Sequence, residues 1–338
     1  MDGTRRVRRP EYFESFRCLG GACPDSCCKE WAVQVDEASA ERWRHLPGKL
    51  GEDLRQYLRE EDGDIVLSLM PDGRCPMWRA DGLCKLQADR GEGELCGTCR
   101  EFPRLSHDYG DFLEQDLELS CPEAARLILL EPDAPVETRE PGYEAPEYDG
   151  EAMEILLGSR ENALKLLGDQ RYSLPEALAA LLLYGCRVQE MLDGGAEACF
   201  APQKELETAA KLAQTGDMAG ILEYFGELEL LTRRWPERLA KPEPGPWLAV
   251  HRAAARYFVR RYWLQAVSDY DLLGRVKLIL VSCLVLKALG GDPIGTAQLY
   301  SKEIENNASN VDALLDACYM EPAFADVKLL GLLLEDKR

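Results

Sequence analysis

The sequence predicts an α+β protein made of a small cysteine-rich N-terminal domain of loops and hairpins and a mostly α-helical C-terminal domain. Nine of the thirteen cysteines lie before residue 122. Residues 131–150 carry four prolines and seven acidic residues against one arginine, which is typical of a linker or an extended wrap. Beyond that stretch, Leu, Ala and Tyr recur at helical spacing.

These observations predict three parts. Residues 1–130 are expected to form a cysteine-rich metal domain of the iron–sulfur type, residues 131–150 an acidic proline-rich linker, and residues 151–338 a helical domain. A chain of 338 residues is long enough for this division, because domains typically contain 50 to 250 residues.

Alternation of apolar and polar residues, capping residues and turn residues predict the elements of the N-terminal part. Cys121 is expected at a helix start, because Pro122 and Glu123 follow it. The expected elements are a strand at 31–36, a helix at 36–46 capped by Asp36, a helix at 51–61, a strand at 64–70, hairpins around 80–82 and 109–111, and a helix at 121–130.

Helical spacing predicts nine helices in the C-terminal part, and the sequence KPEPGP at 241–246 divides them into two groups. The expected helices cover 151–168, 173–193, 203–215, 217–233, 247–267, 270–290, 294–306, 310–318 and 322–335.

Charge and hydropathy exclude several classes of function. The formal net charge of −20 argues against a nucleic-acid-binding protein, and suits either a lysine-bearing partner or simple solubility. No apolar segment follows the basic run Arg5–Arg9, and the apolar run Leu278–Leu286 is too short to cross a membrane. We therefore expect a cytoplasmic protein, in which many cysteines indicate metal or redox chemistry.

The cysteines of the N-terminal part predict a metal site with thiolate ligands. Four of them lie between Cys18 and Cys28 in the spacing C-x4-C-x3-C-C. The chain has only three histidines, and thiolates select zinc, Cu(I) or iron–sulfur clusters. Buried thiols that act as small hydrophobic groups are the alternative, but these cysteines lie in turns and at a helix start.

The sulfurs outnumber the four ligands of one structural zinc ion. A [4Fe–4S] cluster also takes four thiolates but tolerates irregular spacing, so it is favoured, with zinc as the alternative. Eight or nine thiols could serve one cluster with spares, or two centres. The later cysteines are far apart in the sequence and are expected to pack in the helical core. They are Cys186, Cys199, Cys283 and Cys318. No glycine-rich dinucleotide fingerprint is present.

An ordered set of short motifs resembles one family across roughly residues 10–130. The motifs are Cys18-x4-Cys23-x3-Cys27-Cys28, Cys75-Pro76, Leu83-Cys84, Thr98-Cys99-Arg100-x-Phe102-Pro103-Arg104 and Ser120-Cys121-Pro122-Glu123-Ala124-Ala125-Arg126. They resemble the bacterial flagellin lysine-N-methylases, whose N-terminal part belongs to the wider cysteine-cluster proteins described as zinc- or iron-chelating.

This resemblance implies a methyltransferase that moves methyl groups from S-adenosylmethionine to surface lysines of flagellin and contains a [4Fe–4S] cluster. Compared with the family, Cys96 is an extra thiol in this sequence. The resemblance does not imply a 5′-deoxyadenosyl radical, because Glu30 stands where the third cysteine of the radical S-adenosylmethionine motif C-x3-C-x2-C would fall. The cysteines that match the family are Cys18, Cys23, Cys27, Cys28, Cys75, Cys84, Cys99 and Cys121.

Arg100 and Arg104 form a closely spaced guanidinium pair among the thiols. They could hold the carboxylate of S-adenosylmethionine, or neutralise the cluster and nearby acids. Two rival functions remain: a metal-binding or electron-carrying module without methyl transfer, and an interaction protein with a structural metal. A pocket between the domains would favour the enzyme, whereas a closed site without a cavity would favour the rivals.

Overall fold

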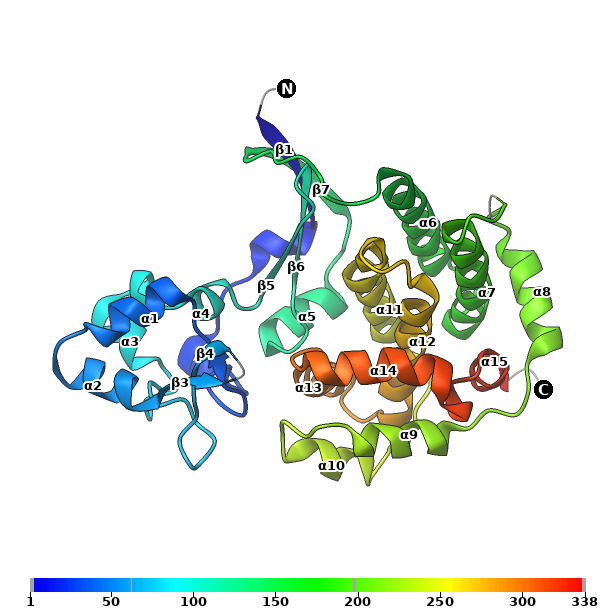
Figure 1. Ribbon diagram of the computed structural model, residues 1–338. Coiled ribbons are helices and arrows are strands. Elements are labelled where there is room, and N and C mark those ends of the chain that lie inside the picture. Colours follow the sequence, from blue (N-terminus) through cyan, green and yellow to red (C-terminus); the bar gives the residue numbers. More distant parts are fainter. Residues whose placement is uncertain (1–2, 62, 197–198, 336–338) are drawn as a thin grey trace.

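The computed structural model describes residues 3–61, 63–196 and 199–335 and confirms the α+β class with a mostly helical C-terminal region (Figure 1). The strands are β1 Thr4–Pro10, β2 Val33–Gln34, β3 Leu58–Glu61, β4 Asp64–Leu67, β5 Arg104–Asp108, β6 Phe112–Leu117 and β7 Pro135–Pro141.

Within the described residues, five 3-10 helices accompany the α-helices. The α-helices of the N-terminal part are α1 Glu37–Arg44, α2 Gly48–Tyr57, α3 Lys85–Arg90, α4 Gly97–Glu101 and α5 Pro122–Leu130. Those of the C-terminal region are α6 Gly150–Gly168, α7 Leu174–Leu192, α8 Pro202–Leu212, α9 Met218–Glu227, α10 Arg234–Leu239, α11 Ala249–Tyr262, α12 Leu272–Leu289, α13 Pro293–Ile304, α14 Ala308–Met320 and α15 Asp326–Leu334. The 3-10 helices are η1 Glu11–Ser15, η2 Gly20–Ala22, η3 Glu92–Glu94, η4 Trp263–Val267 and η5 Pro322–Phe324.

A four-stranded sheet in the order β5-β6-β1-β7 joins the chain start to the acidic stretch. Strand β1 runs parallel to β6 and antiparallel to β7, with seven residue pairs between β1 and β7. Opposite charges accompany this pairing, because Arg5 contacts Glu140 at 2.9 Å and Arg8 contacts Glu137 at 3.0 Å. The stretch 131–150, predicted as a linker or an extended wrap, thus contributes an edge strand.

A smaller three-stranded sheet, β2-β4-β3, packs with the short helices of the cysteine-rich part. Asp36 caps α1 as predicted, because its side chain accepts a hydrogen bond from the Ser39 amide at 2.9 Å. The helix predicted over 51–61 is wrong for its last four residues. Helix α2 ends at Tyr57, and β3 pairs antiparallel with β4 so that Leu58 lies opposite Leu67.

The C-terminal helices surround α12, which lies at the centre of the helical region and packs against α7, α11, α13 and α14 (Figure 1). The sequence of α12 is apolar on all sides, because almost every side chain of this helix is buried in the core. The predicted helix at 217–233 is too long, because α9 ends at Glu227 and a separate helix, α10, begins at Arg234.

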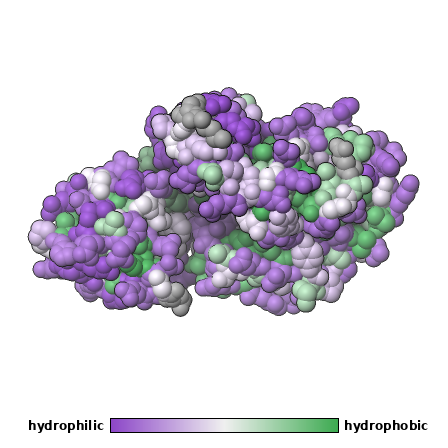
Figure 2. Space-filling view, turned by 45° about the horizontal axis from the view of Figure 1, so that its top comes forward, coloured by the Kyte–Doolittle hydropathy of each residue, from purple (hydrophilic) through white to green (hydrophobic). Residues whose placement is uncertain are grey.

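The buried residues form two hydrophobic cores. The larger core joins Tyr12, Phe112 and helix α5 to the C-terminal helices. The smaller core contains only residues between 33 and 96. The larger core therefore extends across the predicted boundary at 131–150, and the division into three domains stays a prediction. Figure 2 shows a largely hydrophilic face that is hollowed between a smaller and a larger lobe.

Within the described ranges, no helix has both the length and the apolar character that crossing a membrane requires.

Half-buried carboxylates that contact α11 attach the N-terminal sheet to the helical region. Asp133 accepts two hydrogen bonds from Arg256, at 2.8 and 2.9 Å, and also pairs with Arg260. Burial acts to raise the pKa of Asp133, but the hydrogen bond from Arg256 and the charges of both arginines hold it below its usual value. Arg260 also donates to Asp116 at 2.9 Å and to Tyr12 at 2.8 Å.

Replacing Asp133 by Asn should therefore lower the free energy of unfolding by about 2–3 kcal/mol, because Arg256 and Arg260 would lose this carboxylate partner. Urea unfolding followed by circular dichroism measures the change. Asp72→Asn is the matched control, since its ion pair with Arg74 is exposed and its removal should not change stability measurably. Equal stability of Asp133→Asn and the wild type would contradict this account.

Candidate metal centre

Four separate segments bring the predicted thiols to one cavity of about 400 Å³. This volume lies in the range of roughly 300–1,000 Å³ that is usual for small-molecule sites. All eight cysteines that match the family line the cavity, and Cys96 does not. The lining cysteines are Cys18, Cys23, Cys27, Cys28, Cys75, Cys84, Cys99 and Cys121.

The segment 18–28, called the cysteine loop below, carries four of these thiols and is anchored at both ends. At its start, η1 buries Tyr12 and Phe13 in the larger core. At its end, the Cys75 amide donates to the Cys28 carbonyl at 2.8 Å, and the Glu30 amide donates to the Gly73 carbonyl at 2.9 Å. These backbone hydrogen bonds place Cys28 beside Cys75.

The turn 79–83 lies directly against the cysteine loop. A Cβ atom on Gly21 would stand 2.6 Å from the Asp81 carbonyl oxygen, and one on Gly82 would stand 3.2 Å from the Gly21 Cα. Only glycine permits so close an approach of two backbones, and Gly82 also has a positive φ of 80°. The predicted hairpin at this turn is reduced to a single bridge between Trp78 and Cys84.

Three cysteines stand at the position just before a helix: Cys84 before α3, Cys96 before α4 and Cys121 before α5. The prediction for Cys121 is confirmed. Burial raises the pKa of Cys121 to about 12, although the amides of Ala124 and Glu123 act in the opposite direction. In the metal-free protein this thiol is therefore protonated at neutral pH.

Neighbouring thiols influence one another throughout the cavity. Burial raises the pKa of Cys75 to about 11, and the thiols of Cys84, Cys27 and Cys96 add to this effect. A hydrogen bond with Cys28, followed by burial, raises the pKa of Cys27. These effects follow from geometry, because Cys27, Cys28, Cys75 and Cys84 line one cavity although they are distant in the sequence.

Cys96 and Cys99 form a hydrogen-bonded pair at the start of α4. This interaction acts to lower the pKa of Cys96 and to raise that of Cys99. Cys96 is completely buried and points towards the Gln34 carbonyl, at 3.9 Å. The extra thiol thus lies behind Cys99, outside the cavity lining.

The thiols line a common space without forming a closed ligand shell. In the parts of the chain that the structure describes, no three Cys, His, Asp or Glu side chains converge closely enough to hold a metal ion. The donor set nevertheless fits a thiolate-bound centre, because soft sulfur ligands surround the cavity and no histidine lines it.

Arg100 and Arg104 both line the cavity. Either role predicted for them, holding a carboxylate or neutralising a cluster, needs this position. The Arg104 guanidinium lies over the Phe16 ring, 5.2 Å from its centre, and this contact restricts its position. Arg100 lies on α4 with its Nε 3.9 Å from a carboxylate oxygen of Glu101. The two arginines therefore have different surroundings.

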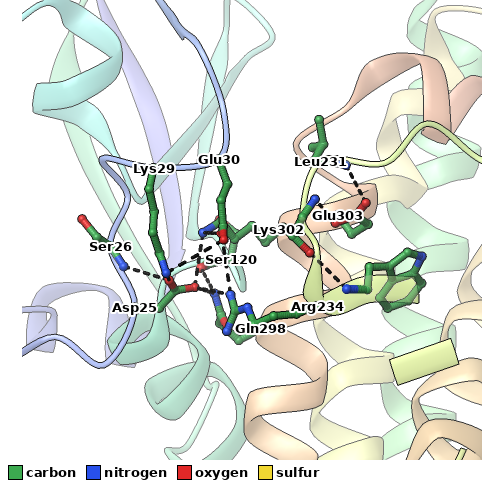
Figure 3. Close-up of polar contacts among 12 residues, drawn as sticks. Asp25, Ser26, Lys29, Glu30, Ser120, Leu231, Arg234, Gln298, Lys302 and Glu303 are labelled. Atoms are coloured by element: carbon green, nitrogen blue, oxygen red, sulfur yellow. Dashed lines mark hydrogen bonds and ion pairs between the residues drawn. The ribbon is translucent and has the colours of Figure 1, made fainter. Parts of the chain in front are cut away.

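Sequence reasoning missed the contribution of the helical region to this cavity. Lys302 on α13 and Asn306, just after the end of α13, line the cavity wall. They lie there together with Trp31 and Met77 of the cysteine-rich part. No local motif marks Lys302, because a lysine in a helix is usually a solvated residue. Here it is 4% exposed and contacts Asp25 and Glu30 of the cysteine-rich part (Figure 3).

The core prediction for the later cysteines is confirmed for two of them. Cys283 and Cys318 are buried in the helical core, and Cys186 on α7 is half-buried. The core prediction is wrong for Cys199, which is exposed and lies in the segment that connects α7 to α8. Helix α7 already ends at Leu192, so Cys199 does not belong to a packed helix.

The chain has relatives among curated proteins. It is 32% identical over 136 residues to the flagellar biosynthetic protein FliU of Salmonella muenchen, and the match covers 38% of this chain and 79% of that protein. The lysine-N-methylases of Salmonella typhimurium and Salmonella choleraesuis match with the same identity over 136 residues. The matched part spans 33% of the length of these two enzymes.

No protein-family model and no solved structure matches the chain. The match to FliU extends over most of that relative, at an identity at which common ancestry is clear. The motif resemblance found in the sequence points to the same proteins. The chain belongs to the family of the flagellar biosynthetic protein FliU and the lysine-N-methylases.

Proposed function

We propose that this protein is a lysine N-methyltransferase that uses S-adenosylmethionine to methylate flagellin and holds an iron–sulfur cluster in the thiol cavity. The observation that carries the proposal is the gathering of eight thiols around one cavity large enough for a small molecule. The relationship to proteins named lysine-N-methylase supports the reaction class. A cavity of this kind favours an enzyme over a purely structural metal site.

The size of the cavity favours a [4Fe–4S] cluster, with zinc as the alternative. A structural zinc ion takes four ligands at about 2.3 Å in a closed shell, which needs no open space, whereas a cluster of four irons takes the same number of thiolates and occupies more room. Four of the lining thiolates would hold the cluster. A bound cluster supplies iron that can act as an electron carrier or as a Lewis acid.

Arg104 is the better of the two arginines for holding the carboxylate of S-adenosylmethionine. Its guanidinium is restrained over Phe16 at the cavity wall. Within the described ranges, no carboxylate lies within ion-pair distance of it, whereas Arg100 lies near Glu101. A guanidinium can donate two parallel hydrogen bonds to a carboxylate, so Arg104 would orient the methyl donor. Neutralisation of a negatively charged cluster is the competing role.

The cavity lining suits a lysine side chain that must lose its proton before it attacks. Free lysine has a pKa of about 10.4, and the neutral amine is the nucleophile. Trp31, Met77 and Leu83 line the cavity, and such apolar surroundings lower the pKa of a lysine that enters. Attack by the neutral amine on the methyl carbon then forms an N–C bond and breaks the sulfonium S–C bond, which leaves a methylammonium group on the lysine and a neutral thioether as the leaving group.

Flagellin as the substrate is proposed from the family and from charge. The formal net charge of −20 attracts a surface rich in lysine, and this attraction weakens as the salt concentration rises. The alternative function is a metal-binding or electron-carrying protein without methyl transfer. It draws support from the limited length that this chain shares with the lysine-N-methylases.

Anaerobically purified protein should be brown, and Cys27→Ser and Cys121→Ser should lose most of the iron, because both thiols line the cavity. Cys283→Ser should retain the iron, since Cys283 is buried in α12 away from the thiols. Iron, acid-labile sulfide and visible absorption are measured for all three variants. Colourless protein with stoichiometric zinc, or equal iron content in the three variants, would refute the cluster.

Metal uptake by the metal-free protein should release protons and become tighter as pH rises. The pKa values of Cys75, about 11, and of Cys121, about 12, lie above neutral pH, so each thiol must lose a proton to become a ligand. Between pH 6.5 and 8, the apparent affinity for zinc should rise roughly tenfold per pH unit for each such thiol. Competition with a chromogenic chelator measures it, and an affinity independent of pH would count against thiolate ligands.

Incubation of the metal-loaded protein with flagellin and labelled S-adenosylmethionine should place label on flagellin lysines. Arg104→Gln should raise the KM for S-adenosylmethionine about tenfold or more while iron content stays normal, because a charge-assisted contact is lost. Arg79→Gln is the matched control, since this arginine pairs with Asp81 and does not line the cavity. Absence of label with intact wild-type protein would favour the metal-binding alternative.

A further inference from the structure

We infer that Asp25 and Lys302 are positioning residues that hold the cysteine loop against the helical region and thereby shape one wall of the thiol cavity. The contact set is called the Asp25 latch below. Its members are Asp25, Lys29 and Glu30 on the cysteine-rich side and Arg234, Gln298 and Lys302 on the helical side.

Asp25 lies between Cys23 and Cys27 and is 6% exposed. Its carboxylate receives contacts from two helices of the C-terminal region (Figure 3). The Arg234 guanidinium of α10 donates at 2.7 Å, the Gln298 amide of α13 at 3.1 Å, and the Lys302 ammonium of α13 at 3.3 Å. The Ser26 amide and the Lys29 ammonium also contact it, at 2.9 and 2.7 Å, so the helices and its own segment together satisfy and position this buried carboxylate.

Lys302 binds the cysteine-rich part at a second point. Its Nζ donates to Glu30 Oε2 at 2.7 Å, and Glu30 itself has a left-handed backbone with φ of 72°. A residue other than glycine seldom keeps that conformation unless its surroundings hold it. Lys302 also lines the cavity, so one side chain joins the latch to the thiols. Gln298 extends the contact set by donating to the Ser120 carbonyl at 2.7 Å, next to Cys121.

Apolar packing ties the cysteine loop to the larger core at the start of the loop, through Tyr12 and Phe13, but not at the latch. Among the described residues, no helix or strand of the smaller core packs extensively against the helices of the larger core. The cavity nevertheless takes lining residues from both sides, such as Trp43 and Met77 from the smaller core and Lys302 from α13. The relative position of the thiols therefore depends on the polar contacts of the latch.

Asp25→Asn and Lys302→Met test the inference in the full-length protein, both as purified and after removal of metal with a chelator. Amide hydrogen exchange of residues 18–30 should become at least about tenfold faster, because buried hydrogen bonds to charged groups are lost. Exchange in α12 should stay unchanged. Metal content should fall below about half of the wild-type value, since the thiols of the loop are no longer held in place.

Lys277→Met is the matched control. Lys277 is also a buried lysine of the helical region, and it contacts Asp326 at 2.9 Å and not the cysteine loop. This variant should keep wild-type exchange at residues 18–30 and wild-type metal content. The inference is overturned if both latch variants behave like the wild type in the loop, or if Lys277→Met loosens the loop equally.

The metal measurement rests on the proposed function, whereas the exchange measurement does not. If the wild-type protein holds no metal, the proposed cluster is wrong, and exchange of residues 18–30 in the metal-free variants still decides the role of the latch. Faster exchange confined to the loop would support it. Unchanged exchange would refute it whatever the metal content.

Discussion

The arrangement of the two lobes depends on a carboxylate, Asp25, that is buried between a cysteine-bearing loop and two helices. A buried charge is costly unless several donors satisfy it, so its partners must all be present at once. This requirement makes the contact specific, because few other arrangements of the lobes would supply donors from α10 and α13 together. The thiol cavity lies beside this contact and shares Lys302 with it.

Opposite charges also organise the other junctions of this acidic protein. The arginines of β1 lie opposite acids of β7, and Asp133 lies against two arginines of α11. Several acidic residues of the stretch 131–150 are therefore already paired with arginines of this chain. The basic run near the chain start has the same explanation, since Arg5 and Arg8 are partners of that stretch.

The cavity gives the family relationship a chemical meaning. Thiols alone would suit a closed structural site. Here the thiols surround an open cavity whose wall also contains apolar side chains and two arginines. Such a combination can hold a metal centre and a small charged molecule side by side. Glu30, which interrupts the spacing C-x3-C-x2-C, has a structural role in the contact with Lys302.

The sequence by itself determined the local features: the α+β class, the cap at Asp36, the helix start at Cys121, the hairpin at 109–111 and the membership of eight thiols in one group. The first four follow from the spacing of nearby residues, which periodicity and capping rules describe, whereas the choice of the eight thiols came from the family resemblance. Only the tertiary structure decided that β7 pairs with β1, that residues 58–61 form a strand, that Cys96 lies behind Cys99, and that Lys302 borders the thiols. The physical reason is that β7 with β1, Cys96 with Gln34 and Lys302 with Asp25 are contacts between residues far apart in the chain, which leave no periodic trace in either segment. Residues 58–61 form a strand because they pair with β4, although their own spacing indicated a helix.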